Sequence, residues 1–210
     1  MQIDIIPVTS FQQNCSIIWD DNKNAVIVDP GGEANKLIQR IEELSLNLKL
    51  ILLTHGHLDH IADAPKLKSH FNVEIWGANS KDDYWYKGLA QQSLQFGQLF
   101  EATSFEPDRW LNDENEVIEV GDLRFEILYL PGHTPGHIGF IEKTQKIAFT
   151  GDVLFKNSIG RTDFPGGNHQ ELLDSIRNKL FTLDDDTIII PGHGPYTTIG
   201  QEKQHNPYLA

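Results

Sequence analysis

The sequence has 210 residues, of which 39% are hydrophobic and 22% are charged, and its formal net charge at pH 7 is −13. This length and composition fit one compact globular domain over residues 1–210. The excess of negative charge argues against nucleic-acid backbones and anionic membranes as partners. Without an apolar run of about 18 residues, the chain predicts no membrane-spanning helix. The single cysteine, Cys15, excludes an internal disulfide, and together with an N-terminus that lacks a basic signal region it predicts a cytoplasmic protein.

The first third of the chain predicts strands alternating with helices. A hairpin is expected around the polar residues 20–24, and a helix with apolar residues at helical spacing is expected after Asp29-Pro30-Gly31-Gly32. The predicted order is a strand, the two hairpin strands, a helix, a buried strand, a helix and a short strand, over residues 3–7, 16–19, 25–29, 33–46, 48–54, 60–71 and 73–76.

The remaining residues predict a helical segment interrupted at Gly88 and Gly97, followed by hairpins, a helix, a last strand and a loop-rich tail. These elements are expected over residues 81–100, 117–119 with 123–130, 137–142 with 146–150, 170–180 and 187–190. Each half of the chain thus contains several strands with one or two helices. This order favours an α/β fold of two sheets covered by outer helices, a four-layer αββα sandwich, over a singly wound parallel sheet.

Four side chains that commonly bind metals follow the buried strand predicted over residues 48–54, and they are His55, His57, Asp59 and His60. Residues two apart in an extended chain point the same way. His55 and His57 are therefore expected on one side, whereas Asp59 and His60 come from the turn that follows. One short segment can thus supply ligands to two adjacent metal ions.

Three further loops repeat this arrangement, because in each an apolar strand ends, a glycine appears and one His or Asp is presented. They carry His133, Asp152 and His193. Four strand ends meeting at one edge would build a preformed polar pocket. Imidazole and carboxylate ligands without thiolate suit zinc, iron or manganese. The sequence therefore predicts a site for two divalent metal ions, with zinc as the first expectation.

The other candidate residues have weaker patterns around them. His137 begins a predicted strand and is expected to have a structural role or to support a ligand. Asp29 is expected to fix a turn or to hydrogen-bond a ligand rather than to bind metal. His70, His169 and His205 are expected at the surface.

The sequence resembles the metallo-β-lactamase superfamily, and its glyoxalase II branch in particular, over nearly the whole chain. The resemblance rests on the segment Thr54-His55-Gly56-His57-Leu58-Asp59-His60, on His133, Asp152 and His193, and on the C-terminal residues 191–209. It implies His55, His57 and His133 on one metal ion, Asp59, His60 and His193 on the second, and Asp152 bridging both. Larger glyoxalase II enzymes continue into a helical C-terminal region that contacts glutathione. This chain ends soon after His193, so no such domain is expected and thioester recognition is expected to be broader or weaker.

The resemblance also implies a reaction, the hydrolysis of S-D-lactoylglutathione to D-lactate and glutathione in methylglyoxal detoxification. A single zinc ion already lowers the pKa of bound water to about 7. A hydroxide held between two metal ions, oriented by Asp59 and Asp152, is expected to attack the thioester carbonyl. In the family a basic residue contacts the glutathione carboxylate, and Arg161 is the candidate here, with a structural salt bridge as the alternative. The aromatic stretch over residues 84–100 is expected to pack in the core, although it can also line the pocket.

The nearest alternative is a persulfide dioxygenase acting on glutathione persulfide. That branch shares the ligand motifs and the loop over residues 160–164 but uses a single iron ion, which would be held by His55, His133 and Asp152. The pattern of residues 191–209 favours the hydrolase. A secreted β-lactamase is disfavoured because that type places a cysteine where Asp152 stands, and a metallo-RNase because its nucleic-acid domain is missing. A non-catalytic scaffold is disfavoured because all seven ligands are present, and the oligomeric state stays open.

Overall fold

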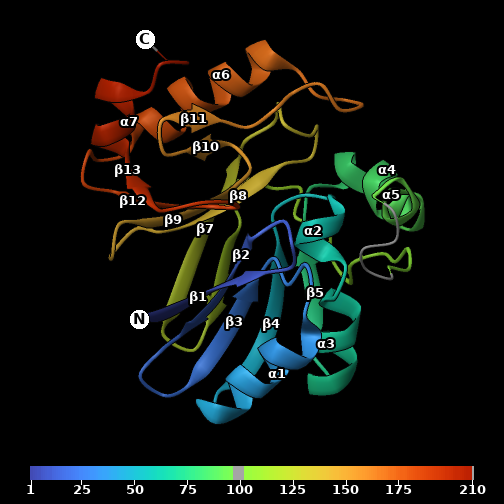
Figure 1. Ribbon diagram of the computed structural model, residues 1–210. Helices are drawn as coiled ribbons and strands as arrows, with labels where there is room; N and C mark the ends of the chain where they lie inside the picture. The colour runs from blue at the N-terminus through green and yellow to red at the C-terminus, as the bar shows by residue number, and fades with distance from the viewer. Residues whose placement is uncertain (97–101, 210) are drawn as a thin grey trace.

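The structure, a computed structural model, describes residues 1–96 and 102–209. The described residues form two main β-sheets that face each other, with helices on the outer side of each sheet (Figure 1). In the N-terminal sheet the strand order is β1-β2-β3-β4-β5; β1, β2 and β3 are antiparallel neighbours, and β3, β4 and β5 run parallel. Its strands are β1 (Gln2–Val8), β2 (Gln13–Trp19), β3 (Asn24–Val28), β4 (Asn47–Leu53) and β5 (Glu74–Gly77).

The C-terminal sheet has the strand order β13-β12-β9-β8-β7-β6, in which β9 and β12 are parallel and the other neighbours are antiparallel. Its strands are β6 (Val117–Val120), β7 (Leu123–Tyr129), β8 (Ile138–Glu142), β9 (Ile147–Gly151), β12 (Ile188–Pro191) and β13 (Thr197–Thr198). A small hairpin of β10 (Leu154–Phe155) and β11 (Ser158–Ile159) follows β9 and was not predicted, because strands of two residues leave no periodic pattern.

Helices α1 and α3 lie against the N-terminal sheet, and α6 and α7 lie against the C-terminal sheet (Figure 1). The longer helices are α1 (Ala34–Glu43), α3 (Ala64–Phe71), α6 (His169–Asn178) and α7 (Ile199–His205). The shorter ones are α2 (Leu58–Ile61), η1 (Ser80–Asp82), α4 (Asp83–Lys87), α5 (Leu89–Gln95) and η2 (Leu180–Thr182). None of the helices within these described ranges is long and apolar enough to cross a membrane.

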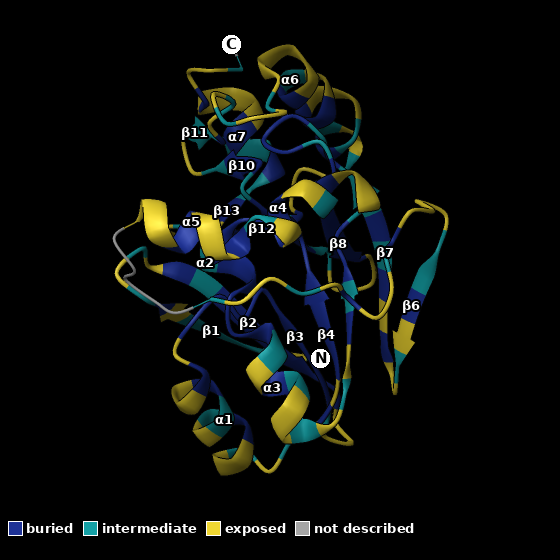
Figure 2. Cartoon of the chain, turned by 90° about the vertical axis from the view of Figure 1, so that its right-hand side faces the viewer, coloured by how far each residue is buried: buried dark blue, intermediate teal, exposed yellow. Residues whose placement is uncertain are grey.

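Side chains alternate across the C-terminal sheet because successive residues of a strand face opposite sides. Phe140 and Phe149 belong to the core shared with the N-terminal sheet, whereas their neighbours Ile141 and Ala148 belong to the core under α6 and α7. Both faces of this sheet are therefore covered. Figure 2 shows buried residues concentrated in the strands and exposed residues on the outer turns of α1, α3 and α6. The predicted four-layer αββα sandwich is confirmed.

Strand direction brings the loops of the predicted site together. Because β7 and β9 are each antiparallel to β8, and β12 is parallel to β9, the strands β7, β9 and β12 all end at the same edge of their sheet. The end of β4 in the other sheet reaches this edge, where the N–H of Ile138 donates a hydrogen bond to the carbonyl of Thr54 (2.9 Å). The loops after β4, β7, β9 and β12 therefore meet.

The single helix predicted over residues 60–71 is wrong, because α2 ends at Ile61 and α3 begins at Ala64. Pro65 explains the break, since a residue without an N–H suits the first turn of a new helix. The intervening Asp63 is tied elsewhere, because its carboxylate accepts a hydrogen bond from the N–H of Ala34 (2.8 Å).

The tail predicted as loop-rich is also wrong, because it contains β13 and α7. The hydroxyl of Thr198 caps α7 by accepting a hydrogen bond from the N–H of Gln201 (3.2 Å). The interruption predicted at Gly88 is confirmed, since α4 ends and α5 begins there. The one predicted at Gly97 lies outside the described residues.

Candidate metal centre

Three imidazoles form the first cluster of the candidate metal centre. His55 and His57 follow the end of β4, and His133 follows the end of β7 in the other sheet. The Nδ1 atom of His57 lies 3.0 Å from Nε2 of His55 and 2.9 Å from Nε2 of His133. All three ligand atoms lie within 4.8 Å of one another, and all three residues are buried. This spacing suits one metal ion bound by three imidazole nitrogens.

The second cluster contains Asp59, His60 and His193. Asp59 and His60 lie in α2, and His193 follows the end of β12. The Nε2 atom of His193 lies 3.2 Å from Oδ2 of Asp59, and Nε2 of His60 lies 3.9 Å from the same oxygen. One carboxylate and two imidazoles suit a second divalent ion. The residues of the two clusters are those that the family resemblance assigns to the two metal ions, and Asp29, His55 and His60 form a third group whose ligand atoms also lie within 4.8 Å of one another.

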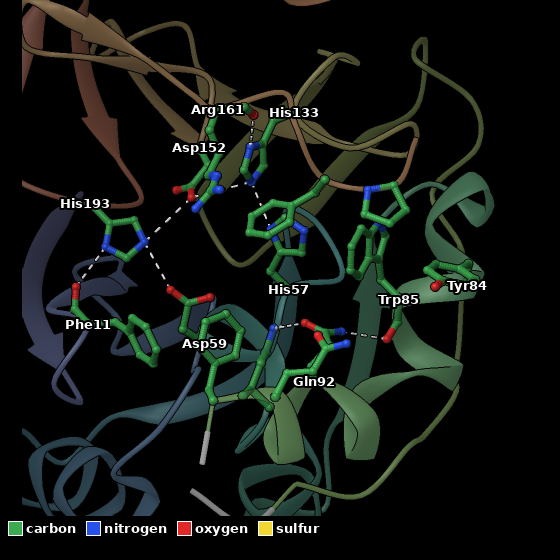
Figure 3. A pocket seen from close by; sticks show the side chains of 15 residues that line it. Phe11, His57, Asp59, Tyr84, Trp85, Gln92, His133, Asp152, Arg161 and His193 are labelled. Atoms are coloured by element: carbon green, nitrogen blue, oxygen red, sulfur yellow. Dashed lines mark hydrogen bonds and ion pairs between the residues drawn. The ribbon is translucent and has the colours of Figure 1, made fainter. Parts of the chain in front are cut away.

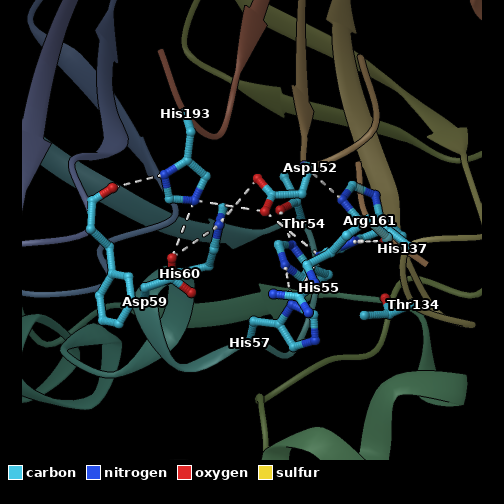
Figure 4. A network of polar contacts seen from close by, with 12 residues as sticks. Thr54, His55, His57, Asp59, His60, Thr134, His137, Asp152, Arg161 and His193 are labelled. Carbon is cyan, nitrogen blue, oxygen red and sulfur yellow. Dashed lines mark hydrogen bonds and ion pairs between the residues drawn. The ribbon is translucent and has the colours of Figure 1, made fainter. Parts of the chain in front are cut away.

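Asp152 lies between the two clusters (Figure 4). Its Oδ1 atom is 3.4 Å from Nε2 of His60, and its Oδ2 atom is 3.6 Å from Nε2 of His133 and 3.6 Å from Nε2 of His193. This carboxylate therefore faces nitrogens of both clusters at once, which is the position that a bridging ligand needs.

The outer nitrogens of two imidazoles are held by backbone carbonyls. Nδ1 of His133 donates a hydrogen bond to the carbonyl of Arg161 (2.7 Å), and Nδ1 of His193 donates one to the carbonyl of Phe11 (3.0 Å). Each ring therefore keeps Nε2 as the nitrogen with a free lone pair, and that nitrogen faces its cluster.

Asp29 supports the segment that carries the first four candidate ligands. Its carboxylate accepts hydrogen bonds from the N–H of Thr54 (2.8 Å), the hydroxyl of Thr54 (2.6 Å) and Nδ1 of His60 (2.8 Å). The Thr54 hydroxyl oxygen in turn lies 3.0 Å from Nδ1 of His55, from which it accepts. Asp29 thus orients His60 directly and His55 through Thr54, in keeping with its predicted supporting role.

The donor set fits divalent cations. Nε2 of His60 and Oδ1 of Asp152 are buried and have no hydrogen-bond partner among the described residues. Burying two such atoms beside each other would cost folding free energy unless a positive charge lay between them. The inward-facing ligand atoms are nitrogen and oxygen only, which suits zinc, iron or manganese.

The two clusters differ in electrostatics. Burial lowers the pKa of His55, His57 and His133, which keeps these imidazoles neutral and able to bind a metal. Burial also lowers the pKa of His60, but Asp152 and Asp59 raise it by more, so it lies well above its ordinary value. The carboxylates of the second cluster thus attract a positive charge, which a metal ion can supply in place of a proton.

A cavity of about 370 Å³ opens over both clusters (Figure 3). This volume suits a small-molecule substrate. Aromatic rings form much of its wall, and those of Trp85 and Phe164 lie 4.5 Å and 5.0 Å from the ring of His57. The residues that line it are Phe11, His57, Leu58, Asp59, Tyr84, Trp85, Gln92, Gln95, Phe96, His133, Asp152, Arg161, Phe164, Pro165 and His193.

Arg161 lines the cavity, and its guanidinium group is already engaged. It pairs with both carboxylate oxygens of Asp163 (2.7 and 2.6 Å) and lies 4.2 Å from the centre of the Phe164 ring. The structure therefore places Arg161 where a substrate carboxylate can reach it, and also gives it the salt bridge that was the alternative prediction.

The other predicted positions are mostly as expected. His137 is buried and stacks on His55 (4.7 Å between ring centres), and its Nε2 accepts a hydrogen bond from the N–H of Asp152 (3.1 Å). His70, His169 and His205 are exposed. In the aromatic stretch, Tyr84, Trp85 and Phe96 line the cavity, whereas Tyr86 belongs to the core. The prediction that this stretch packs in the core is therefore correct only for part of it.

Two buried residues at the site were not predicted, Asp82 and Gln92. The amide of Gln92 accepts a hydrogen bond from the N–H of Leu58 (2.9 Å) and donates to the carbonyls of Gly56 (3.2 Å) and Trp85 (2.9 Å). It therefore fastens α5 to the segment that carries the candidate ligands. The sequence contains no signal for this, because a lone polar residue in a helical segment is usually exposed.

A known class of metal-dependent proteins has this architecture, in which two facing sheets carry helices on their outer sides and two clusters of candidate metal ligands lie at one sheet edge. The sequence profile of the metallo-beta-lactamase superfamily matches residues 8–193, a range that contains every residue of both clusters. The chain belongs to this superfamily, and the resemblance found in the sequence is confirmed.

Particular relatives are similar over their whole length. The hydroxyacylglutathione hydrolase GloC of Haemophilus influenzae is 64% identical over 209 residues, which cover 100% of this chain and 98% of that protein. The crystal structure of the BLEG-1 B3 metallo-beta-lactamase superimposes with a TM-score of 0.92 at 39% identity and covers 100% of both chains. The di-iron-bound form of TTHA1623 superimposes with a TM-score of 0.89 at 32% identity, over 98% of this chain and 100% of that one.

Proposed function

We propose that this chain is a dinuclear metal-dependent hydrolase of glutathione thioesters that converts S-D-lactoylglutathione and water into D-lactate and glutathione. The observation that carries the proposal is the position of Asp152 between a cluster of three histidines and a cluster of one aspartate and two histidines, since a site for two metal ions suits hydrolysis. The proposal is also supported by the 64% sequence identity between this chain and a protein named hydroxyacylglutathione hydrolase. This activity would give the chain a part in methylglyoxal detoxification in the cytoplasm, where its buried Cys15 stays reduced.

In this proposal His55, His57 and His133 hold one divalent ion, Asp59, His60 and His193 hold the second, and Asp152 holds both. Zinc is the ion we propose first, because it accepts this donor set in tetrahedral sites. Iron or manganese suits the same donors, and the name of the TTHA1623 structure specifies two irons. Because the donors come from both sheets, we further propose that residues 1–210 act as one domain.

The bound ions would supply a Lewis acid for the thioester carbonyl and lower the pKa of water toward neutrality. The residues of the chain provide the rest. Asp59 and Asp152 line the cavity, and their carboxylates orient the attacking water by accepting hydrogen bonds from it. The oxygen of the water adds to the carbonyl carbon and the C–S bond breaks, while both protons of the water pass to solvent and the D-lactate carboxylate forms. The glutathione sulfur leaves as a thiolate, so the site needs no general acid to protonate it.

The test is a substrate panel on protein with a measured metal content. We expect two metal equivalents per chain and rapid release of thiol from S-D-lactoylglutathione. Oxygen uptake with glutathione persulfide, together with a single iron, would replace this function by that of a dioxygenase. Two bound metal ions with no thioester hydrolysis would exclude the proposal.

Hydrolysis of β-lactams is the second candidate, because a chain 39% identical over its full length is named a B3 metallo-beta-lactamase. The reaction is related, since water adds to a carbonyl carbon and a C–N bond breaks. A chromogenic cephalosporin belongs in the same panel for this reason. A higher kcat/KM for the cephalosporin than for the thioester would reverse the order of the two candidates.

Arg161 gives a first prediction on substrate binding. Arg161→Ala should raise KM for glutathione thioesters about fivefold, the scale of one partly exposed ion pair, and leave kcat within about twofold. Asp163→Ala is the matched variant, because it frees the guanidinium from its present partner and should lower KM. Steady-state kinetics with a glutathione thioester, and with a thioester that lacks carboxylates, measure both. Equal KM values for wild type and Arg161→Ala on the glutathione ester would remove Arg161 from substrate binding.

A further inference from the structure

A buried carboxylate outside both clusters holds the loops of the first one. Asp82 lies at the end of η1 and its relative exposure is 0%. Its Oδ2 atom accepts hydrogen bonds from the N–H of Gly56 (3.0 Å) and the hydroxyl of Thr134 (2.7 Å), and its Oδ1 atom accepts one from the N–H of Gly136 (2.6 Å). A carboxylate with three donors at these distances is fixed in one orientation.

These three donors belong to the two loops that carry the imidazoles of the first cluster. Gly56 stands between His55 and His57 in the loop after β4, and Thr134 directly follows His133 in the loop after β7. The two loops extend from different sheets, so their relative position depends on contacts at this edge. One side chain therefore links the backbone beside all three imidazoles.

The contact between Asp82 and the second loop is close. A Cβ atom at Gly136 would lie 2.5 Å from the nitrogen of Asp82 and 2.6 Å from the carbonyl oxygen of Asn79, so only glycine fits. The N–H of Asn79 also donates a hydrogen bond to the carbonyl of Gly136 (3.0 Å). Both the N–H and the carbonyl of Gly136 thus bind this loop to residues 79–82.

The second cluster is supported by other groups. Asp29 holds His60, the carbonyl of Phe11 holds His193, and Gln92 holds the N–H of Leu58 next to Asp59. Two of these groups also reach the first cluster, because Asp29 orients His55 through Thr54 and Gln92 donates to the carbonyl of Gly56. The hydrogen bonds found for the Asp82 side chain within residues 1–96 and 102–209 all go to the loops of the first cluster. A change at Asp82 should therefore affect one cluster much more than the other.

We propose that Asp82 is a positioning residue that sets the geometry of the first metal site by fastening the loop of His55 and His57 to the loop of His133. The proposal rests on the ligand assignment made under the proposed function. An asparagine at this position keeps the size of the side chain but replaces one acceptor oxygen by a donor NH₂ group. That group would face the N–H of Gly136 or the N–H of Gly56, so at least one of the hydrogen bonds that join the two loops is lost.

The experiment is metal binding to Asp82→Asn, measured with Co²⁺ by absorption spectra and by competition with a chelator. Loss of a residue that supports metal ligands typically lowers metal affinity about 10–100-fold. We expect a weakening of this size for one metal equivalent, a change within about threefold for the other, and an altered spectrum for the weakened one. Thr134→Val removes one of the three donors and should weaken the same equivalent to a smaller extent, which keeps the test available if Asp82→Asn does not fold.

Glu202→Gln is the matched control. Glu202 is also a buried carboxylate that accepts from a threonine hydroxyl, a backbone N–H and one further donor, but its partners are Thr197, Asn157 and Asn206, away from both clusters. It should lose stability and keep both metal affinities. If Asp82→Asn and Thr134→Val bind both equivalents like wild type, or if Glu202→Gln weakens metal binding equally, the proposal is wrong.

His133→Ala and His193→Ala separate this proposal from the ligand assignment. Each should remove a different metal equivalent, and the one lost in His133→Ala should be the one weakened in Asp82→Asn. If His133→Ala keeps both equivalents, the ligand assignment fails and the role of Asp82 fails with it. If His133→Ala loses one equivalent while Asp82→Asn keeps both at wild-type affinity, only the role of Asp82 is excluded.

Discussion

Asp152→Asn is expected to lower kcat/KM for S-D-lactoylglutathione by about a hundred- to a thousandfold, the scale seen when a main electrostatic stabiliser of the reaction is removed. The reason is charge. Two divalent ions would bring four positive charges to a site whose first cluster contains only neutral imidazoles. Among the proposed ligands, Asp59 and Asp152 supply the negative charge that compensates them. Replacing Asp152 by an amide removes half of that charge.

The position of Asp152 makes the loss larger than a count of charges suggests. Its two oxygens face nitrogens of His60, His133 and His193, so its replacement removes a polar partner from both clusters at once. Burial raises the pKa of this carboxyl, but the surrounding histidines lower it by more, and the net pKa lies well below its ordinary value. The folded protein thus strongly favours the ionised form, which an asparagine cannot supply.

Kinetics and metal analysis of the same preparations measure this effect. We expect Asp152→Asn to contain fewer than two metal equivalents as well as to lose activity. Glu202→Gln again serves as the control, because it replaces a buried carboxylate whose hydrogen bonds go to none of the candidate ligands. An Asp152→Asn protein that retains a tenth or more of wild-type kcat/KM would mean that Asp152 does not bridge.

The sequence could predict much of the site because its strongest signal is local. His55, His57, Asp59 and His60 lie within one turn after a buried strand, so their proximity needs no knowledge of the tertiary fold. His133, Asp152 and His193 were predicted from glycines at strand ends. That inference depended on the strands running in the same direction, which β7, β9 and β12 do.

The supporting residues could not be predicted, because their partners are distant in sequence. Asp82 accepts hydrogen bonds from residues 26, 52 and 54 positions away, and nothing near it in the chain marks it as different from an exposed acid. The errors in secondary structure have similar causes. Helix α7 has little apolar periodicity and is held by Glu202, whose carboxylate accepts a hydrogen bond from the N–H of Asn157 in the loop between β10 and β11 (2.9 Å). The break before α3 differs, because its cause is the local Pro65, and the hydrogen bond from the N–H of Ala34 to Asp63 only adds to it.

At Gly31 the sequence predicts the turn at the correct position but does not reveal the main reason why glycine is needed there. The segment Asp29-Pro30-Gly31-Gly32 predicted a turn between a strand and a helix, and β3 and α1 do flank it. The stronger requirement is space. A Cβ atom at Gly31 would lie 1.5 Å from the carbonyl oxygen of Asp59 and 2.7 Å from the nitrogen of His60. The glycine is therefore needed because the backbone of α2 passes directly over it.

Gly31→Ala should for this reason be the most damaging of the conservative substitutions near the site. The clash is with backbone, so the turn and α2 must move apart, which costs about 3 kcal/mol of folding free energy and lowers Tm by about 10 °C in a chain of this size. The displaced residues Asp59 and His60 belong to the second cluster, so this variant should also lose the metal equivalent that His193→Ala loses.

Gly88→Ala is the matched control, because it adds the same methyl group between α4 and α5 at a negative φ of −86°, where the nearest atom, the carbonyl oxygen of Tyr84, is 3.1 Å away. Gly88 lies at the junction of the two helices and not inside one, and alanine is a poorer N-cap than glycine, so this variant should lower Tm only slightly. Thermal unfolding and metal titration of both variants measure the contrast. Equal Tm values and two metal equivalents in both would show that the turn at Gly31 can move without the metal centre. A loss confined to Gly31→Ala would mean instead that the turn and the second metal site are one rigid unit.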